Sequence, residues 1–491
     1  MNSDSTVVKS NDPLSSGIRR LPAQLVAGVL VLAAYGLYIH RLDGQSLWLD
    51  EVISYLQAIH LWSLPPDLAY LKGHARHWAY EFVLRPWVVL IPNAFGLRWP
   101  SVAAGTVAVA TMYRVGASLG GRWAGLLASA FLLIWPRQVF YSQEAAQYEM
   151  VVLGSLLSLW TMLLVEDRRT RWASWAFPLC VTVTVALHAM VVLWLALLGV
   201  WLALRNKFRI SFAWLGAQVG MLAALAVVAI FDDRISLDWL RKPGLESVAV
   251  LFFDFLGPFP RELNTLFAAV ALALLGLGLW QFWRQPAEGK RPYGGAAATL
   301  LLALLTFGPP LAAYVISHVW RPVWHERYLL PSSVTFFLLL AAAAASMRPR
   351  WLAVALSTII LVTSLLGSIR LYTDPDFQRD NWRGVAAHVV AQGHATDSVL
   401  LAWDNMRRPL RYYLPDERIE VAYLQQGSSE WSEVALRAVL EESDRVWVVV
   451  PEARREDLIL WIGRVEPDAV QLDYVDFGTL DLYLLASPAS R

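Results

Sequence analysis

The chain has 491 residues, of which 57% are hydrophobic and 16% are charged, and it contains 24 tryptophans. This composition is typical of a polytopic membrane protein and argues against a soluble enzyme with one large core. A net charge of +1 without a long Lys/Arg cluster argues against nucleic acid as a partner, and the single Cys180 allows neither a disulfide framework nor a thiolate metal site.

Apolar runs of about twenty residues recur along the first three quarters of the chain, and each can cross a hydrocarbon core of roughly 30 Å as a helix. We predict an α-helical polytopic membrane domain over residues 1–371 with about eleven transmembrane helices. They are expected at residues 21–40, 98–117, 123–140, 146–165, 172–187, 189–204, 210–230, 263–283, 295–316, 328–346 and 350–371.

The basic residues of the short loops indicate how these helices are oriented. Arg19, Arg20, Arg122, the run 166–171 and Arg348 fall on one side, which the positive-inside rule makes cytoplasmic. The prediction is a multi-pass protein of the cell membrane, surrounded by membrane lipids, with a cytoplasmic N-terminus. The segments 41–97, 141–148, 231–262 and 317–327 and all residues after 371 then face the extracytoplasmic side.

Two of these outer segments are long enough to form structure of their own. Segment 41–97 contains a second apolar piece, Trp78–Phe95, which Arg85-Pro86 and Pro92 interrupt, so we expect helices along the membrane interface. Residues 372–491 have the composition of a soluble domain. Candidate strands at 398–402, 445–450 and 480–485 and candidate helices at 381–392, 430–441 and 452–462 predict an extracytoplasmic α/β domain there.

The stretch SLWLDE places Asp50 and Glu51 shortly after the first predicted helix. Carboxylates at a membrane face cost free energy when they lose water, so such a pair is expected to have partners or a catalytic task. Neighbouring residues of a helix point about 100° apart, which favours different roles for the two. A solvated pair at the end of a helix explains the pattern equally well.

A second outer loop, YSQEAAQY, offers Gln143, Glu144 and Tyr148. Glu144 could face Asp50 across one cavity. The alternative is a polar start of the next helix, with Ser142 as its N-cap and Glu144 in its first turn.

A third outer segment contains Arg321 and, in the stretch HERYLLPS, Arg327. Arg327 could bind a phosphate by paired hydrogen bonds, although a snorkelling arginine is common at such positions. His188 lies between two predicted helices, where a hydrogen-bonded structural histidine is the more frequent case.

A divalent metal is a candidate cofactor whose identity is left open. The residues His74, His77, Glu81, His325 and Glu326 offer imidazole and carboxylate ligands that suit zinc and related ions. Their spacing matches no helical motif such as HExxH, and solvated interfacial side chains explain them more simply. The sequence contains no GxxxxGKS loop, dinucleotide fingerprint or GxSxG elbow, which argues against nucleotide-driven transport and serine hydrolysis.

Four motifs in this order resemble the GT-C membrane glycosyltransferases of family 39: SLWLDE, YSQEAAQY, HERYLLPS and QRDNWRGVAAHV. The resemblance extends over nearly the whole chain. It is nearest to the bacterial branch with the aminoarabinose lipid A transferases and, more distantly, to the protein O-mannosyltransferases. It implies an inverting glycosyltransferase that moves a sugar from a polyprenyl-phosphate donor to an extracytoplasmic lipid, glycan or protein acceptor.

The resemblance also implies roles for single residues. Asp50 matches the acidic residue proposed as catalytic base, Glu51 is its neighbour in the motif, and Glu144 matches the carboxylate of the second loop. Arg327 and Tyr328 match the segment expected near the donor phosphate. A carboxylate can take the proton of an acceptor hydroxyl, and a cation can stabilise the leaving phosphate. The predicted substrate-binding residues are completed by Gln143, Tyr148, His188 and Arg321.

Two segments depart from the family pattern. Related sequences often read Ser-Gln-Glu-Ala-Arg-x-Tyr in the second loop, where this chain has Ala146 in place of the arginine. They also often carry His-Pro-Pro in the first loop, where residues 73–78 read GHARHW. Either Arg76 or Arg321 replaces the missing charge or the donor differs, so the sequence identifies neither the sugar nor the acceptor.

Two other functions stay open at this point. A polytopic lipid or glycan transporter would place ionisable residues near mid-membrane or show repeated halves, whereas the charges here gather at one face, which favours the enzyme. A scaffold that binds a glycolipid without turnover is supported only by the two departures.

Overall fold

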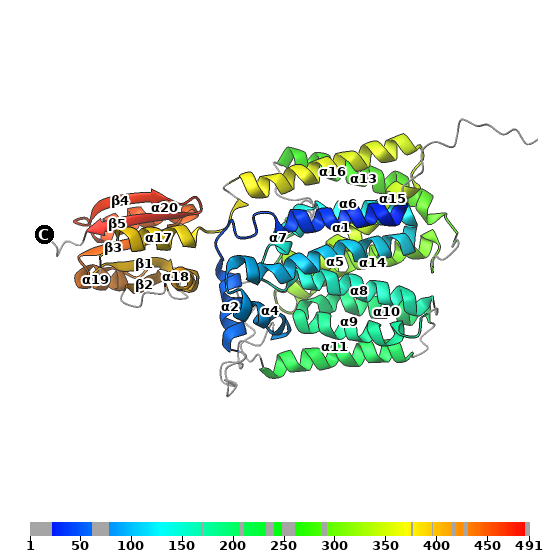
Figure 1. Cartoon of the computed structure of the whole chain (residues 1–491), viewed down its shortest axis with the longest axis horizontal. Coiled ribbons are helices and arrows are strands. Elements are labelled where there is room, and N and C mark those ends of the chain that lie inside the picture. Colours follow the sequence, from blue (N-terminus) through cyan, green and yellow to red (C-terminus); the bar gives the residue numbers. More distant parts are fainter. Residues whose placement is uncertain are drawn as a thin grey trace, which may run out of the picture.

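The computed structural model of the chain describes residues 22–60, 78–167, 170–206, 211–231, 240–247, 261–286, 292–374, 377–394, 396–414, 419–425 and 431–486. A bundle of helices forms one part, and a small domain with a β-sheet lies beyond one end of the bundle (Figure 1). The fold is therefore mostly helical with a C-terminal sheet domain, as predicted.

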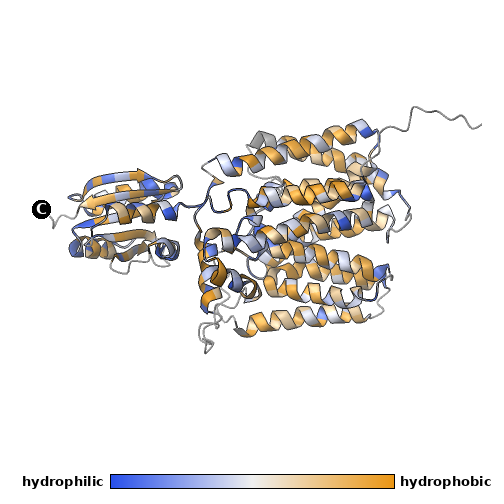
Figure 2. Ribbon diagram, in the orientation of Figure 1, coloured by the Kyte–Doolittle hydropathy of each residue, from blue (hydrophilic) through white to orange (hydrophobic). Residues whose placement is uncertain are grey.

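Every predicted span coincides with helical structure in the bundle. The helices are α1 (Ala23–Ile39), α5 (Ala94–Gly120), α6 (Arg122–Leu133), α7 (Pro136–Ser142), α8 (Tyr148–Glu166), α9 (Ala173–Leu187), α10 (Val192–Arg205), α11 (Phe212–Phe231), α13 (Arg261–Trp283), α14 (Gly295–Val319), α15 (Leu330–Ser346) and α16 (Arg350–Thr373). Most of their residues are hydrophobic (Figure 2).

Within the described residues, seven helices are long and apolar enough to cross a membrane, and the bent pair of α6 and α7 would make an eighth. Three shorter apolar helices, α1, α9 and the helix that ends at Arg205, occupy the other predicted spans. The chain is thus a multi-pass membrane protein, while eleven crossings and a cytoplasmic N-terminus stay predictions.

The bend between α6 and α7 has a local cause. Pro136 begins α7, and the residue before a proline avoids the helical region, so Trp135 is extended, with φ −66° and ψ 126°. The two helices are bent by 64°. After this bend α7 ends at Ser142, and the loop 143–147 lies against the bundle with Glu144 and Ala145 fully buried.

Helix α15 forms the centre of the bundle, and nearly all of its side chains are buried. Small residues let the neighbouring helix approach closely. A Cβ added at Gly278 of α13 would lie 2.4 Å from the carbonyl oxygen of Ala343 in α15, so this contact requires glycine. The alanine run 341–345 of α15 has only small side chains, which makes this approach possible.

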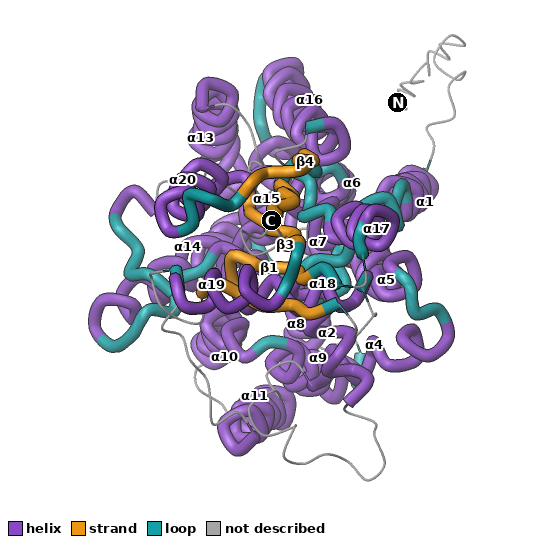
Figure 3. Tube along the Cα trace, turned by 90° about the vertical axis from the view of Figure 1, so that its left-hand side faces the viewer, coloured by secondary structure: helices purple, strands orange, loops and turns teal. Residues whose placement is uncertain are grey.

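Two helices lie across the end of the bundle that faces the sheet domain: α2 (Leu49–His60) and α4 (Trp78–Leu90). We call this end the domain face. The sequence predicts helices in this segment, and both are present, while residues 61–77 lie outside the described part of the chain. Seen along the bundle, the sheet domain lies over the middle of the domain face, with α1, α16 and α11 at the periphery (Figure 3).

The C-terminal domain is built on a five-stranded sheet in the order β2-β1-β3-β5-β4. Its strands are β1 (Ser398–Trp403), β2 (Glu420–Gln425), β3 (Arg445–Pro451), β4 (Val470–Asp476) and β5 (Leu480–Ala486), and its helices are α17 (Trp382–Gln392), α18 (Arg407–Tyr413), α19 (Glu433–Glu442) and α20 (Arg455–Val465). Strands β2, β1 and β3 run parallel, whereas β5 pairs antiparallel with β3 and β4. The sequence predicts β1, β3, β5, α17, α19 and α20 but not β2, β4 or α18. The predicted division of the chain at residue 371 stays a prediction.

Candidate active site at the domain face

Asp50 and Glu51 lie in the first turn of α2. A helix N-terminus favours carboxylates because its free N–H groups carry partial positive charge. The backbone N–H of Trp48 donates to Oε2 of Glu51 at 3.2 Å, which caps the helix locally. Beyond this turn the two carboxylates have entirely different partners, so each is described in turn.

The carboxylate of Asp50 is held by Arg327, from the short 3₁₀ helix η3 (Glu326–Leu329) before α15. Nη1 of Arg327 donates to Oδ2 of Asp50 at 2.7 Å and to the hydroxyl oxygen of Tyr148 at 3.1 Å. The Asp50 side chain is 33% exposed and that of Arg327 is 23% exposed, so this pair is open to a ligand. Among the described residues, Nε of Arg327 is buried and has no hydrogen-bond partner.

A row of stacked and tilted rings extends from this pair. The ring centroids of Tyr148 and His188 are 6.0 Å apart, those of His188 and Tyr328 are 4.8 Å apart, and those of Tyr328 and His325 are 5.4 Å apart. Burial, reinforced by the charge of Arg327, lowers the pKa of His325 to about 4, so this imidazole is neutral at physiological pH. The site thus presents uncharged rings beside the cation.

Glu51 is fully buried and pairs with two arginines that the sequence analysis did not single out. Arg98 donates to its two oxygens from Nε at 2.7 Å and from Nη2 at 2.8 Å, and Nη1 of Arg379 donates at 3.3 Å. The backbone N–H of Ala145 adds a bond of 2.8 Å. Burial opposes ionisation of Glu51, but Arg379 and Arg98 outweigh it and lower the pKa of this carboxyl. Glu51 therefore joins four segments of the chain and has little capacity left for a substrate.

Glu144 lies in the same region and contrasts with Glu51. Its side chain is fully buried, and neither carboxyl oxygen has a hydrogen-bond partner among the described residues. Burial raises the pKa of Glu144 to about 8, against the opposing charge of Arg379, and the charges of Glu51 and Asp50 raise it further. Most of this carboxyl is consequently protonated at neutral pH, which makes it a potential hydrogen-bond donor.

Gln143 holds the loop 143–147 in place. Its Nε2 donates to the carbonyl oxygens of Tyr38 at 2.9 Å and His40 at 2.8 Å, at the end of α1. The backbone carbonyl oxygen of Gln143 accepts a hydrogen bond of 2.9 Å from Nη1 of Arg379. Arg379 therefore supplies positive charge to the loop in which Ala146 replaces the arginine of the family pattern. Arg379 belongs to the motif QRDNWRGV, so this motif could have indicated its role from the sequence.

The predicted residue Arg321 is not brought into this group. The guanidinium of Arg321 lies over the ring of Trp320, 4.8 Å from its centroid, and makes no hydrogen bond to Asp50 or Arg327. Arg76 lies outside the described residues.

The described metal-ligand candidates, Glu81, His325 and Glu326, form no metal cluster either. His74 and His77 lie outside the described residues, and within the described ranges no three His, Cys, Asp or Glu side chains converge on one point. We therefore derive no catalytic step through a metal ion.

Three glycosyltransferases of the GT-C class are among the solved structures with a similar fold. ArnT from Cupriavidus metallidurans bound to undecaprenyl phosphate is 12% identical, with 96% of this chain and 99% of that chain covered at a TM-score of 0.60. The arabinofuranosyltransferase AftD from Mycobacteria is 16% identical, with 96% and 40% covered at a TM-score of 0.51. The oligosaccharyltransferase AglB from Archaeoglobus fulgidus, in complex with an inhibitory peptide and a dolichol-phosphate, is 11% identical, with 94% and 74% covered at 0.51.

No protein-family model and no curated protein sequence matches the chain. At these identities the structural likeness establishes the fold alone. The chain has the GT-C fold over nearly its whole length, as the four motifs predict.

Proposed function

We propose that this membrane protein is an inverting glycosyltransferase that moves a sugar from a polyprenyl-phosphate carrier to an acceptor at the domain face. The observation that carries the proposal is the contact of Asp50 with Arg327 and, through it, with Tyr148 in a partly exposed site. Two structures of this fold, ArnT and AglB, hold a polyprenyl phosphate, which supports a donor of that class.

In the proposed reaction Asp50 is the general base. Its carboxylate takes the proton of the acceptor hydroxyl while the hydroxyl oxygen forms a bond to the anomeric carbon of the donor. The bond from that carbon to the phosphate oxygen breaks on the opposite side, which inverts the configuration. The electron pair leaves with the polyprenyl phosphate, and Arg327 stabilises its charge through Nε and the guanidinium nitrogens that Asp50 does not use.

The other acidic residues act differently in this proposal. Glu144, protonated at neutral pH, can donate a hydrogen bond to an oxygen of the bound donor or acceptor. Glu51 is fully buried, and its carboxylate binds Arg98, Arg379 and the loop 143–147. We therefore assign it a positioning role. Tyr148, Tyr328 and His188 form the wall against which the sugar lies.

Transfer of labelled sugar by the purified protein tests this function. A panel of polyprenyl-phosphate sugars is offered to the wild type, to Asp50→Asn and to Asp404→Asn, which changes an exposed carboxylate of the C-terminal domain. We expect turnover by the wild type and by Asp404→Asn and a loss of about 100-fold or more in Asp50→Asn. Equal turnover in all three proteins would remove Asp50 from the mechanism.

Two further outcomes would favour the other classes of function. Donor binding by the wild type without turnover, for every donor that binds, would identify a glycolipid-binding scaffold. Movement of an intact donor across proteoliposomes without sugar transfer would identify a transporter.

A further inference from the structure

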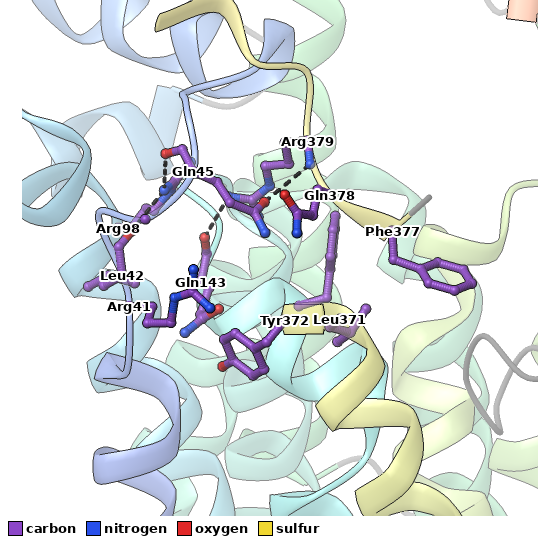
Figure 4. A pocket seen from close by; sticks show the side chains of 12 residues that line it. Arg41, Leu42, Gln45, Arg98, Gln143, Leu371, Tyr372, Phe377, Gln378 and Arg379 are labelled. Atoms are coloured by element: carbon purple, nitrogen blue, oxygen red, sulfur yellow. Dashed lines mark hydrogen bonds between the residues drawn. The ribbon is translucent and has the colours of Figure 1, made fainter. Parts of the chain in front are cut away.

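A cavity lies at the domain face, between the end of α1 and the end of α16 (Figure 4). It encloses about 580 Å³ of space, including the solvent at its mouth. We call it the α1–α16 pocket. Its polar lining consists of three arginines and three glutamines, Arg41, Arg98, Arg379, Gln45, Gln143 and Gln378.

The arginines of this pocket are not balanced by carboxylates. No Asp or Glu is among the described residues that line it, and Glu51 behind the wall pairs with both Arg98 and Arg379. The guanidinium of Arg41 makes no hydrogen bond or ion pair among the described residues; it acts electrostatically on Tyr372 and is exposed. Among the described residues, three arginines line the pocket and Glu51 forms ion pairs with two of them, so the lining is positively charged.

Arg379 keeps unused hydrogen-bonding capacity at the inner end. Its side chain is 6% exposed, and its Nε has no hydrogen-bond partner within the described part of the chain. A buried, unpartnered N–H of a charged group is costly unless a ligand accepts from it. Arg41 at the mouth and Arg379 at the inner end are therefore both available to one anion, with the amides of Gln45 and Gln378 beside them.

The pocket lies at the level where helices leave the bilayer. Arg41 follows the last residue of α1 by two positions, and the hydroxyl of Tyr372 in the last turn of α16 donates to the carbonyl oxygen of Leu37 at 3.3 Å. Below this contact both helices expose apolar side chains, such as Leu32 at 73% and Leu366 at 49%. These side chains face acyl chains in a membrane, so the pocket opens where lipid headgroups lie.

We propose that the α1–α16 pocket binds the phosphate headgroup of an anionic lipid whose acyl chains lie along α1 and α16. Guanidinium groups suit phosphate because their N–H donors match its oxygens in pairs. Leu371 and Phe377 in the lining contact the start of the lipid chains. This site is separate from the Asp50–Arg327 contact, since the Glu51 ion pairs and the loop 143–147 stand between them. The proposal does not depend on the transferase activity.

The headgroup can be larger than a phosphate. A neighbouring cleft of about 500 Å³ reaches the C-terminal domain at Phe477 and Thr479. It shares four lining residues with the α1–α16 pocket, namely Gly44, Gln45, Gln378 and Arg379. A polar substituent on the phosphate therefore has a continuous path toward the C-terminal domain.

Binding of short-chain lipids to the full-length protein in neutral detergent tests the proposal. The probes are dihexanoyl phosphatidic acid, zwitterionic dihexanoyl phosphatidylcholine and inorganic phosphate, and calorimetry gives their dissociation constants. Arg41→Gln is compared with Arg408→Gln, which changes an exposed arginine of α18. We expect Arg41→Gln to weaken binding of phosphatidic acid by about tenfold or more, Arg408→Gln to leave it unchanged, and phosphatidylcholine to bind much more weakly.

Three results would overturn this inference. Equal affinity of wild type and Arg41→Gln for phosphatidic acid would remove the pocket from lipid recognition. Inorganic phosphate that binds as tightly as phosphatidic acid would show a free-ion site without lipid recognition. A photoactivatable phosphatidic acid gives a readout that does not depend on any variant: cross-links at Leu371 and Tyr372 are expected in the wild type, and cross-links confined to other helices would contradict the proposal.

Discussion

Glu51 and Arg98 form a two-pronged ion pair that is sealed from solvent, with bonds of 2.7 and 2.8 Å and side chains that are 0% and 2% exposed. Arg98 also donates to the carbonyl oxygens of Leu42 and Ser46, each at 2.8 Å. One guanidinium therefore fixes the start of α5 to the segment that leads into α2. The position of Asp50 depends on this pair, because Asp50 and Glu51 share the first turn of α2.

Glu51→Gln should destabilise the protein by about 3–5 kcal/mol, because removal of one partner leaves buried guanidinium charge without compensation. The measurement is the unfolding of the purified protein in detergent, followed by tryptophan fluorescence against denaturant. Glu452→Gln, at an exposed carboxylate of the C-terminal domain, is the matched control and should change stability by less than about 0.5 kcal/mol. Similar unfolding midpoints for both variants would show that the buried pair is not needed for the fold.

Glu144→Gln should make stability less dependent on pH. Burial raises the pKa of Glu144 from 4.5 to about 8 in the folded protein, so the folded state holds a proton that the unfolded state releases between these values. The stabilisation is complete below pH 4.5 and is lost as the pH rises toward about 8, by at most about 1.4 kcal/mol per pH unit from this group. Unfolding of wild type and variant at pH 5, 6.5 and 8 measures this. Parallel stability profiles would mean that Glu144 titrates normally.

The fold could be predicted where the composition and length of a segment alone determine its structure. Each apolar run is long enough to cross the bilayer alone, so its length and composition suffice to locate it. Strands β2 and β4 escaped prediction because both are edge strands of the sheet. Every residue of β4 is partly buried or exposed, and the strand lacks the apolar run that marks β1, β3 and β5.

The candidate site could be predicted only in part. Asp50, Arg327 and Tyr148 stand in recognisable motifs, and the structure brings them together. The partners of Glu51 are 47 and 328 residues away in sequence, and no local pattern pairs residues at such separations. The same limit applies to Glu144, whose orphaned oxygens depend on how α7 bends at Pro136.

Docking of the C-terminal domain should depend more on Tyr413 than on Arg383. The hydroxyl oxygen of Tyr413 accepts a bond of 2.6 Å from the backbone N–H of Leu47, a residue that is fully buried. Tyr413→Phe leaves that N–H unsatisfied, at about 1–3 kcal/mol. The pair of Arg383 with Asp43 is 44% and 51% exposed, and such pairs contribute about 0–1 kcal/mol. Limited proteolysis of the linker near residue 377 should therefore accelerate more in Tyr413→Phe than in Arg383→Gln, and the opposite order would contradict this account.

Arg327→Lys should lower kcat/KM for the donor by about tenfold or more, although it keeps the charge. The arginine reaches Asp50 at 2.7 Å and Tyr148 at 3.1 Å from one nitrogen and still has Nε free within the described part of the chain for the donor phosphate. A lysine has a single nitrogen for all three partners. Tyr148→Phe removes only the bond to the hydroxyl and should have the smaller effect. Steady-state kinetics with the accepted donor separates the roles: loss of phosphate recognition raises KM, whereas loss of the base in Asp50→Asn lowers kcat. If Arg327→Lys keeps full activity, its charge alone is sufficient and the paired geometry plays no part in donor binding.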